Sequence, residues 1–211
     1  MSDAEPQTPP VAAISSFRND VMRLVTGTGI AQLIGILAAP ILAKLFAPEA
    51  FGIATLFASL TLIFGVVACL RYELSIVLPD EDSEAANLLG VSLLASVAMS
   101  ALLALLVGIA GPQLAGWAGI PELAPYLWLL PLAILLHGTF SAFNYWNTRT
   151  KNFSRLAATR VTNQVVVTST NLSAGFAGFA TGGVMIAAGL AGRGTAILVL
   201  ATGILRDSGR L

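Results

Sequence analysis

Six stretches of about 20 residues with few or no charges recur along this chain, and they constrain its fold more than any other feature. Each is long enough to cross about 30 Å of hydrocarbon as a helix that rises about 1.5 Å per residue. We therefore predict an all-α, polytopic integral membrane protein with a disordered cytoplasmic tail over residues 1–17 and a six-helix transmembrane bundle over residues 18–211. The predicted spans are 24–45, 51–70, 88–110, 125–146, 161–181 and 183–205.

The composition favours a membrane protein over a soluble one. Hydrophobic residues make up 56% of the chain and charged residues only 10%, with a mean hydropathy of +0.82. A soluble helical core would need a polar face on most helices, and the stretches 51–70 and 88–110 show almost none. A transmembrane barrel would need apolar and polar residues in alternation, whereas "VSLLASVAMSALLALLVGIAG" is continuously apolar.

The basic residues predict the orientation, because all but two of them fall on one side of the six predicted spans. The exceptions are Lys44, on the other side, and Arg193, within a span. The positive-inside rule then places both termini in the cytoplasm. The basic stretch 147–160 is expected to be a cytoplasmic loop held by anionic headgroups, with specific recognition of a lipid phosphate as the alternative.

Two predicted spans carry polar stripes. Gln32 lies on such a stripe in the first span, and Gln164, Thr168 and Asn171 follow one another at steps of four and three in the fifth. One interpretation is an interface between helices, which the GxxxG spacing from Gly178 to Gly182 would support. The other interpretation is a water-filled cavity that solvates a hydrophilic substrate.

Two ionisable residues lie inside the predicted spans. Arg193 sits about 15 Å from either end of the sixth span, too far for its side chain to reach the interface, and the predicted spans contain no Asp or Glu to pair with it. Its partners are therefore expected to be backbone carbonyls, water or an external anion. His137 in the fourth span could relay protons or bind a cation, but a hydrogen-bonded histidine at a helix interface is favoured because it has no acidic partner.

The known catalytic motifs are absent, so we expect no enzyme activity. The chain has no HExxH, CxxC, Walker or GxSxG pattern. We expect no metal, no cofactor and no nucleic-acid partner. Cys69 is the single cysteine and is expected to pack as a small hydrophobe.

Three stretches carry a resemblance to a known family. They are "APILAKLFAPEAFGIATLF" (39–57), "RYELSIVLPDEDSEAANLLGVSLL" (71–94) and "NTRTKNFSRLAATRV" (147–161). Together they resemble the polysaccharide biosynthesis proteins, which are O-antigen-type lipid-linked oligosaccharide flippases of the multidrug/oligosaccharidyl-lipid/polysaccharide exporter superfamily. The second stretch is the most specific, with Arg71, Tyr72 and Glu73 as a motif on the cytoplasmic face.

The resemblance implies a transporter of the bacterial inner membrane. Such a protein carries a polyprenyl-pyrophosphate-linked oligosaccharide to the periplasmic leaflet for a surface polysaccharide such as the O-antigen of lipopolysaccharide or an exopolysaccharide. Family members have two six-helix bundles, and this chain matches the N-terminal one. We therefore expect a truncated or half-length member that needs a second six-helix bundle, supplied by itself or encoded separately.

Combining the residues with the resemblance gives a hypothesis for substrate binding. Arg193 would contact the anionic pyrophosphate, while Gln32, Gln164, Thr168 and Asn171 would hydrogen-bond the sugar hydroxyls. One alternative is half of a cation-coupled drug exporter, which should place an acidic residue in the membrane. The other is a non-transporting membrane subunit of a polysaccharide assembly complex.

Overall fold

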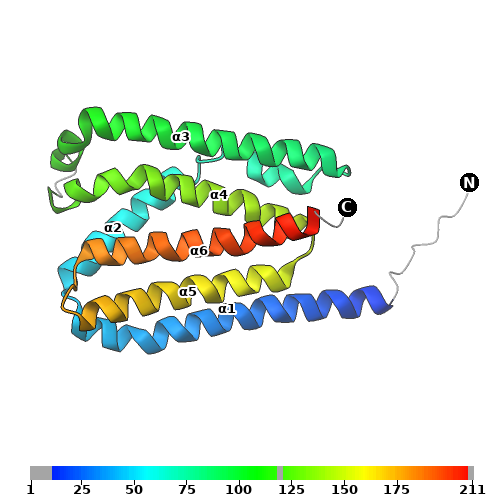
Figure 1. Ribbon diagram of the computed structural model, residues 1–211, viewed down its shortest axis with the longest axis horizontal. Helices are drawn as coiled ribbons and strands as arrows, with labels where there is room; N and C mark the ends of the chain where they lie inside the picture. Colours follow the sequence, from blue (N-terminus) through cyan, green and yellow to red (C-terminus); the bar gives the residue numbers. More distant parts are fainter. Residues whose placement is uncertain (1–10, 118–120, 209–211) are drawn as a thin grey trace, which may run out of the picture.

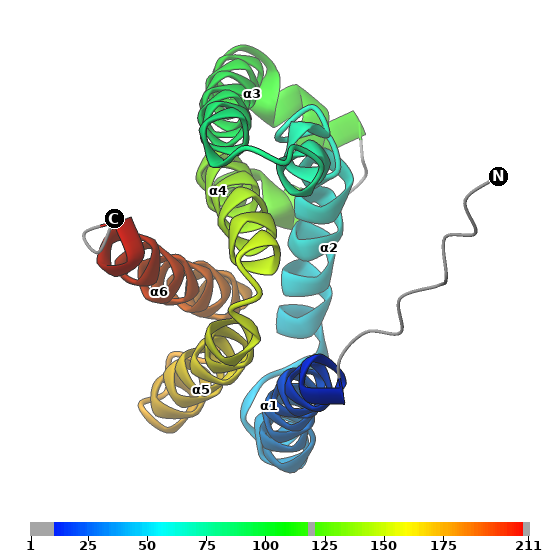
Figure 2. The same ribbon diagram turned by 90° about the vertical axis from the view of Figure 1, so that its right-hand side faces the viewer.

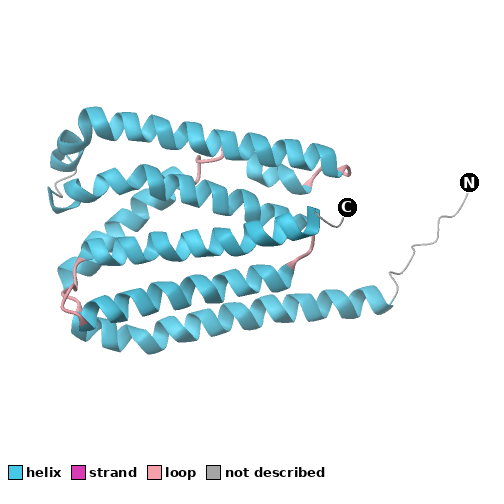
Figure 3. Cartoon of the chain, in the orientation of Figure 1, coloured by secondary structure: helices cyan, strands magenta, loops and turns pink. Residues whose placement is uncertain are grey.

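The computed structural model describes residues 11–117 and 121–208, and all regular structure within them is helical (Figure 3). The main helices are α1 (Val11–Leu45), α2 (Pro48–Gly65), α3 (Asp82–Trp117), α4 (Leu130–Arg149), α5 (Phe153–Phe176) and α6 (Gly182–Ser208). Two 3₁₀ segments, η1 (Tyr72–Val77) and η2 (Pro121–Leu129), precede α3 and α4. The predicted all-helical fold is confirmed.

The helices lie side by side along one axis and reverse direction at each main connection (Figure 1). The first described turn of α1 and the last turn of α6 lie at the same end of the bundle. This end also carries the start of α3 and the α4–α5 connection, and we call it the basic end because Arg149 and Lys151 lie there. The α1–α2, α3–α4 and α5–α6 connections lie at the opposite end.

Seen end-on, α5 stands between α1 and α6, and α4 stands between α6 and α3 (Figure 2). Helix α2 packs against both α4 and α6. A buried hydrophobic cluster lies where α2, α3, α4, α6 and η2 meet, and it includes Phe57, Leu103, Leu127, Ile134 and Ile186. Helix α1 lies outside this cluster and packs mainly on α5.

Five of the helical segments are long and apolar enough to cross a membrane. They are Val21–Leu45, Pro48–Gly65, Asp82–Ile109, Pro121–Arg149 and Gly182–Arg206. Helix α5 falls outside this group because polar side chains interrupt its apolar surface, although it runs alongside α1 and α6 (Figure 1). The predicted multi-pass architecture is therefore confirmed, while a sixth span through α5 stays a prediction.

Three boundaries differ from the sequence-based expectation. Helix α1 begins at Val11, inside the range 1–17 predicted as a disordered tail, and residues 1–10 lie outside the described residues. The predicted basic loop 147–160 is wrong in extent. Most of its residues are helical, because α4 continues to Arg149 and α5 begins at Phe153.

The predicted GxxxG pair is also not on one helix. Helix α5 ends at Phe176, Gly178 has a φ of +83° in the following turn, and Gly182 is the first residue of α6. Glycine adopts this left-handed conformation without the steric cost that other residues incur. The pair therefore marks the turn between two helices.

Candidate functional site

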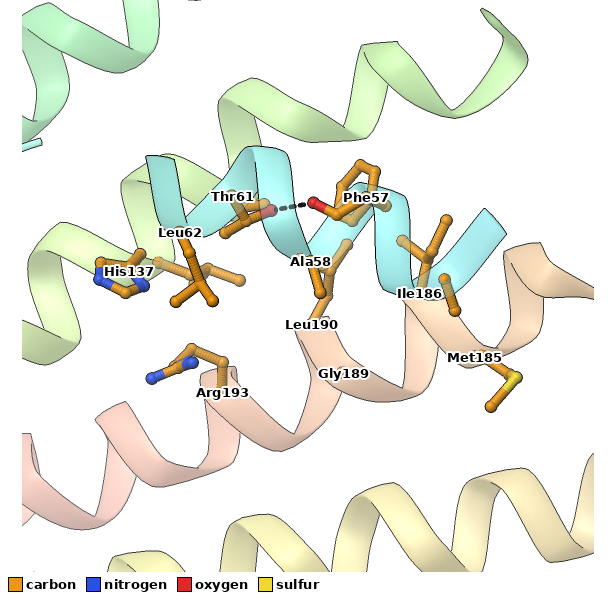
Figure 4. Close-up of a pocket in the computed structure, with 13 residues that line it drawn as sticks. Phe57, Ala58, Thr61, Leu62, His137, Met185, Ile186, Gly189, Leu190 and Arg193 are labelled. Atoms are coloured by element: carbon orange, nitrogen blue, oxygen red, sulfur yellow. Dashed lines mark hydrogen bonds between the residues drawn. The ribbon is translucent and has the colours of Figure 1, made fainter. Parts of the chain in front are cut away.

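A cavity of about 300 Å³ lies between α2, α4 and α6 (Figure 4). Its wall is mostly aliphatic and aromatic, and its polar side chains are Thr61, His137 and Arg193. These three come from three different helices, so the cavity exists only when the bundle is assembled. We call it the Arg193 pocket.

Arg193 reaches this pocket from the middle of α6. It lies about 16 Å along the helix from Gly182, which keeps it far from both ends. Its guanidinium carbon lies 4.8 Å from the centroid of the Phe140 ring on α4, within the range of a cation–π contact. Within the described part of the chain, no hydrogen bond or ion pair reaches this guanidinium. Its N–H donors therefore remain available to water or an anion.

His137 lies beside Arg193 in the same pocket (Figure 4). Its Nδ1 atom is buried and has no hydrogen-bond partner among the described residues. The ring packs on Gly65 of α2 so closely that a Cβ there would lie 2.8 Å from its Cδ2 atom. The predicted interface position is confirmed, but the predicted hydrogen bond is not found between this histidine and any described residue. Cation binding is disfavoured because a guanidinium shares the pocket.

The predicted sugar-binding residues on α5 lie elsewhere, at the contact between α5 and α1. Gln164 Nε2 donates a hydrogen bond to Thr168 Oγ1 at 3.1 Å, and it lies so close to Gly35 of α1 that a Cβ there would be 3.0 Å away. Asn171 is 4% exposed, and its Oδ1 has no partner within the described residues. These positions match the interface interpretation of the stripe.

Gln32 is exposed on α1 and lines a second hollow between α1 and α5. The structure therefore brings neither Gln32 nor the three α5 residues into the Arg193 pocket. Their contact with a substrate stays a prediction.

The Arg71-Tyr72-Glu73 motif lies where the chain turns from α2 into η1, just after Cys69, whose Sγ donates to the carbonyl oxygen of Gly138 in the middle of α4 at 3.3 Å. Arg71 is exposed with a φ of +66°, and Tyr72 is 45% exposed. Glu73 is 5% exposed, and its Oε2 has no partner among the described groups. The segment η1 packs against α3 and α4, so the motif holds the α2–α3 connection against the bundle.

The structure gives two residues a contact that the sequence analysis did not predict. Phe140 follows His137 by three residues, and this helical spacing was the only signal that it shares a face with the histidine. Arg149 at the end of α4 pairs with Asp82 at 2.9 Å and donates hydrogen bonds to the carbonyl oxygens of Pro79 and Asp80. Nothing in the local sequence indicates this second contact, because its partners lie far away in the chain.

The helical segments described above identify the general class of this protein. A bundle with five helical segments that are long and apolar enough to cross a membrane is a multi-pass membrane protein. Residues 41–202 match the family described as polysaccharide biosynthesis protein, and the chain belongs to that family. The resemblance drawn from the three sequence stretches is confirmed at this level. No curated protein and no solved structure matches the chain.

Proposed function

We propose that this protein is a flippase that moves a polyprenyl-pyrophosphate-linked oligosaccharide across the bacterial inner membrane. Membership of the polysaccharide biosynthesis protein family supports a role in making a surface polysaccharide. The observation that carries the transport proposal is Arg193, a cation in the middle of a predicted span with no acidic partner among the described residues.

A substrate anion explains why this cation sits in an apolar bundle. A centred arginine adds about 2.5–3.5 kcal/mol to the free energy of inserting α6, so a contact that stabilises its charge is expected. Polar or charged groups inside a membrane commonly mark a substrate pathway. A guanidinium can hold a phosphate through two parallel N–H···O bonds, so Arg193 suits the pyrophosphate of the proposed cargo.

The proposed topology has six spans and cytoplasmic termini. Helix α5 is included because it lies between α1 and α6 along the bundle axis (Figure 2). The cytoplasmic orientation rests on the basic end, where the positive-inside rule expects arginine and lysine. Lys44 is the single lysine or arginine at the opposite end among the described residues.

Alternating access commonly needs one helical bundle to move against another around a shared site. We therefore propose that a second six-helix bundle completes the transporter. Chemical crosslinking followed by size-exclusion chromatography in detergent tests this part, since a strictly monomeric protein that still supports export would contradict it.

Complementation of a strain that lacks the gene tests the role of Arg193. We expect Arg193→Gln to lose most surface polysaccharide and Arg193→Lys to retain an intermediate amount, because lysine keeps the charge but not the two-pronged geometry. Arg206→Gln is the matched control, since it removes an arginine from the exposed end of the same helix. Normal polysaccharide with Arg193→Gln at normal protein levels would refute the proposed charge contact.

A further inference from the structure

A second hollow, of about 360 Å³, lies in the groove between α1 and α5 and is separate from the Arg193 pocket. It is lined by Leu24, Val25, Thr28, Gly29, Gln32 and Arg160. We call it the Arg160 groove. Its lining combines polar side chains with aliphatic ones, so its chemistry suits an amphiphile.

Arg160 is held in position by a neighbouring helix. Its Nη1 donates a hydrogen bond to Thr28 Oγ1, and that hydroxyl donates in turn to the carbonyl oxygen of Leu24 at 2.7 Å. The Thr28 hydroxyl is thus occupied by Arg160 and by its own helix. Most of the N–H donors of Arg160 have no partner within the described chain, and no acidic side chain lines the groove.

The depth of the groove distinguishes it from the Arg193 pocket. Thr28 lies about 25 Å before the end of α1 at Leu45, and Arg160 lies about 24 Å before the end of α5 at Phe176. In a hydrocarbon layer of about 30 Å, both residues therefore lie near the boundary at the basic end. An arginine side chain at this depth reaches the headgroup phosphates, whereas Arg193 does not.

We propose that the Arg160 groove binds the phosphate of an anionic membrane lipid, whose acyl chains extend from there toward the middle of the bundle. Arg160 is the phosphate ligand, Thr28 positions it, and Gln32 can bond the glycerol or ester oxygens. Arginine suits this role because its guanidinium can bond two phosphate oxygens at once. The inference uses the proposed spanning arrangement of α1 and α5 but does not depend on the cargo of the transporter.

Native mass spectrometry of the detergent-purified protein with dioleoyl-phosphatidylglycerol tests the proposal. We expect the wild-type protein to retain this lipid and Arg160→Gln to bind it about tenfold more weakly, since a charge-assisted contact is lost. Thr28→Val should weaken binding by a smaller factor, because the charge of Arg160 stays while the hydrogen bond that positions it is lost. Arg206→Gln is the control and should bind as the wild type does.

Two outcomes would overturn the proposal. One is equal binding of phosphatidylglycerol by the wild type and by both groove variants, all with the same helical content by circular dichroism. The other is displacement of the lipid by millimolar inorganic phosphate. That result would mean that the acyl chains add nothing to the affinity and that free phosphate is the ligand. Retention of the lipid in phosphate buffer supports a lipid headgroup. Neither outcome tests the role of Arg193 in export. The lipid-binding proposal can therefore fail while the proposed transport function stands.

Discussion

The guanidinium carbon of Arg193 on α6 lies 4.8 Å from the centre of the Phe140 ring on α4. This contact joins two helices that are far apart in sequence and orients a cation beside His137 in a largely apolar pocket. A cation–π contact leaves the N–H groups of the guanidinium available as hydrogen-bond donors to an incoming anion.

Replacing Phe140 by leucine should loosen Arg193 without removing its charge. We expect Phe140→Leu to lower the stability of the purified protein by about 1 kcal/mol, the typical size of a cation–π contact. Export should fall between that of the wild type and that of Arg193→Gln. Thermal unfolding in detergent and the complementation assay measure the two effects. Phe176→Leu, at an exposed phenylalanine, should change neither, and an equal effect there would contradict the prediction.

Arg149 should matter more for stability than its acidic partner does. Its side chain is 13% exposed and also bonds main-chain carbonyls, whereas the Asp82 side chain is 83% exposed. Arg149→Gln is expected to cost about 2 kcal/mol because acceptors next to α3 lose their donor. Asp82→Asn should cost below about 1 kcal/mol, as exposed ion pairs do. Thermal unfolding compares the two variants, and equal losses would contradict this ranking.

The close approach of α6 to α5 predicts different responses at two nearby glycines. A Cβ at Gly192 would lie 2.6 Å from Val167 Cγ2 and 3.0 Å from the backbone oxygen of Asn163, whereas a Cβ at Gly194 would meet nothing within 4 Å. Gly192→Ala should therefore destabilise the bundle by about 1–3 kcal/mol, because the helices must move apart. Gly194→Ala should be neutral or slightly stabilising, since alanine favours helix. Thermal unfolding of both proteins checks the contrast.

Cys69 should resist modification while the protein is folded. It lies in the turns after α2, is 1% exposed, and its Sγ donates to the carbonyl oxygen of Gly138 on α4 at 3.3 Å. Because the reagent cannot reach a buried thiol, maleimide labelling at pH 7.5 should be slow in mild detergent and fast in SDS. Rapid labelling of the folded protein would show that the thiol is accessible.

The proposed orientation predicts which residues an impermeant reagent can reach. In a Cys69→Ala background, Glu49→Cys should react with an impermeant maleimide in intact spheroplasts, because it follows α1 at the proposed periplasmic end. Asp80→Cys, at the basic end, should react only in inverted membrane vesicles. Both residues are exposed in the structure, so local burial does not confound the comparison. The reverse pattern would invert the proposed topology.

Local sequence was sufficient to predict most of the fold. Continuous apolar stretches predicted the helices of the five segments that are apolar enough to cross a membrane, and the pattern of Gln164, Thr168 and Asn171 predicted that one face of α5 would be polar. These inferences succeed because span length and helical periodicity depend only on neighbours in sequence. Helix ends were less predictable, as the region 147–160 shows, because basic residues are compatible with both a helix and a loop.

The site was predicted only in part. The sequence singled out Arg193 by its lack of an acidic partner, and the structure shows no such partner among the described residues. The sequence analysis also grouped Arg193 with Gln32 and the polar stripe of α5. In the tertiary structure, Arg193 instead lies beside His137 and Phe140. Hydropathy identifies which residues are unusual in a membrane span but carries no information about which helices pack together.

Sequence by itself determined that this chain forms apolar helices, that it resembles a polysaccharide biosynthesis protein and that one arginine lies deep within a span. The tertiary structure alone decided that α6 packs between α5 and the α2–α4 pair, which creates the Arg193 pocket. It also decided that α1 packs on α5, which creates the Arg160 groove. The physical reason is that helix pairing depends on close complementarity of surfaces, such as Gly65 against His137, between residues distant in the chain.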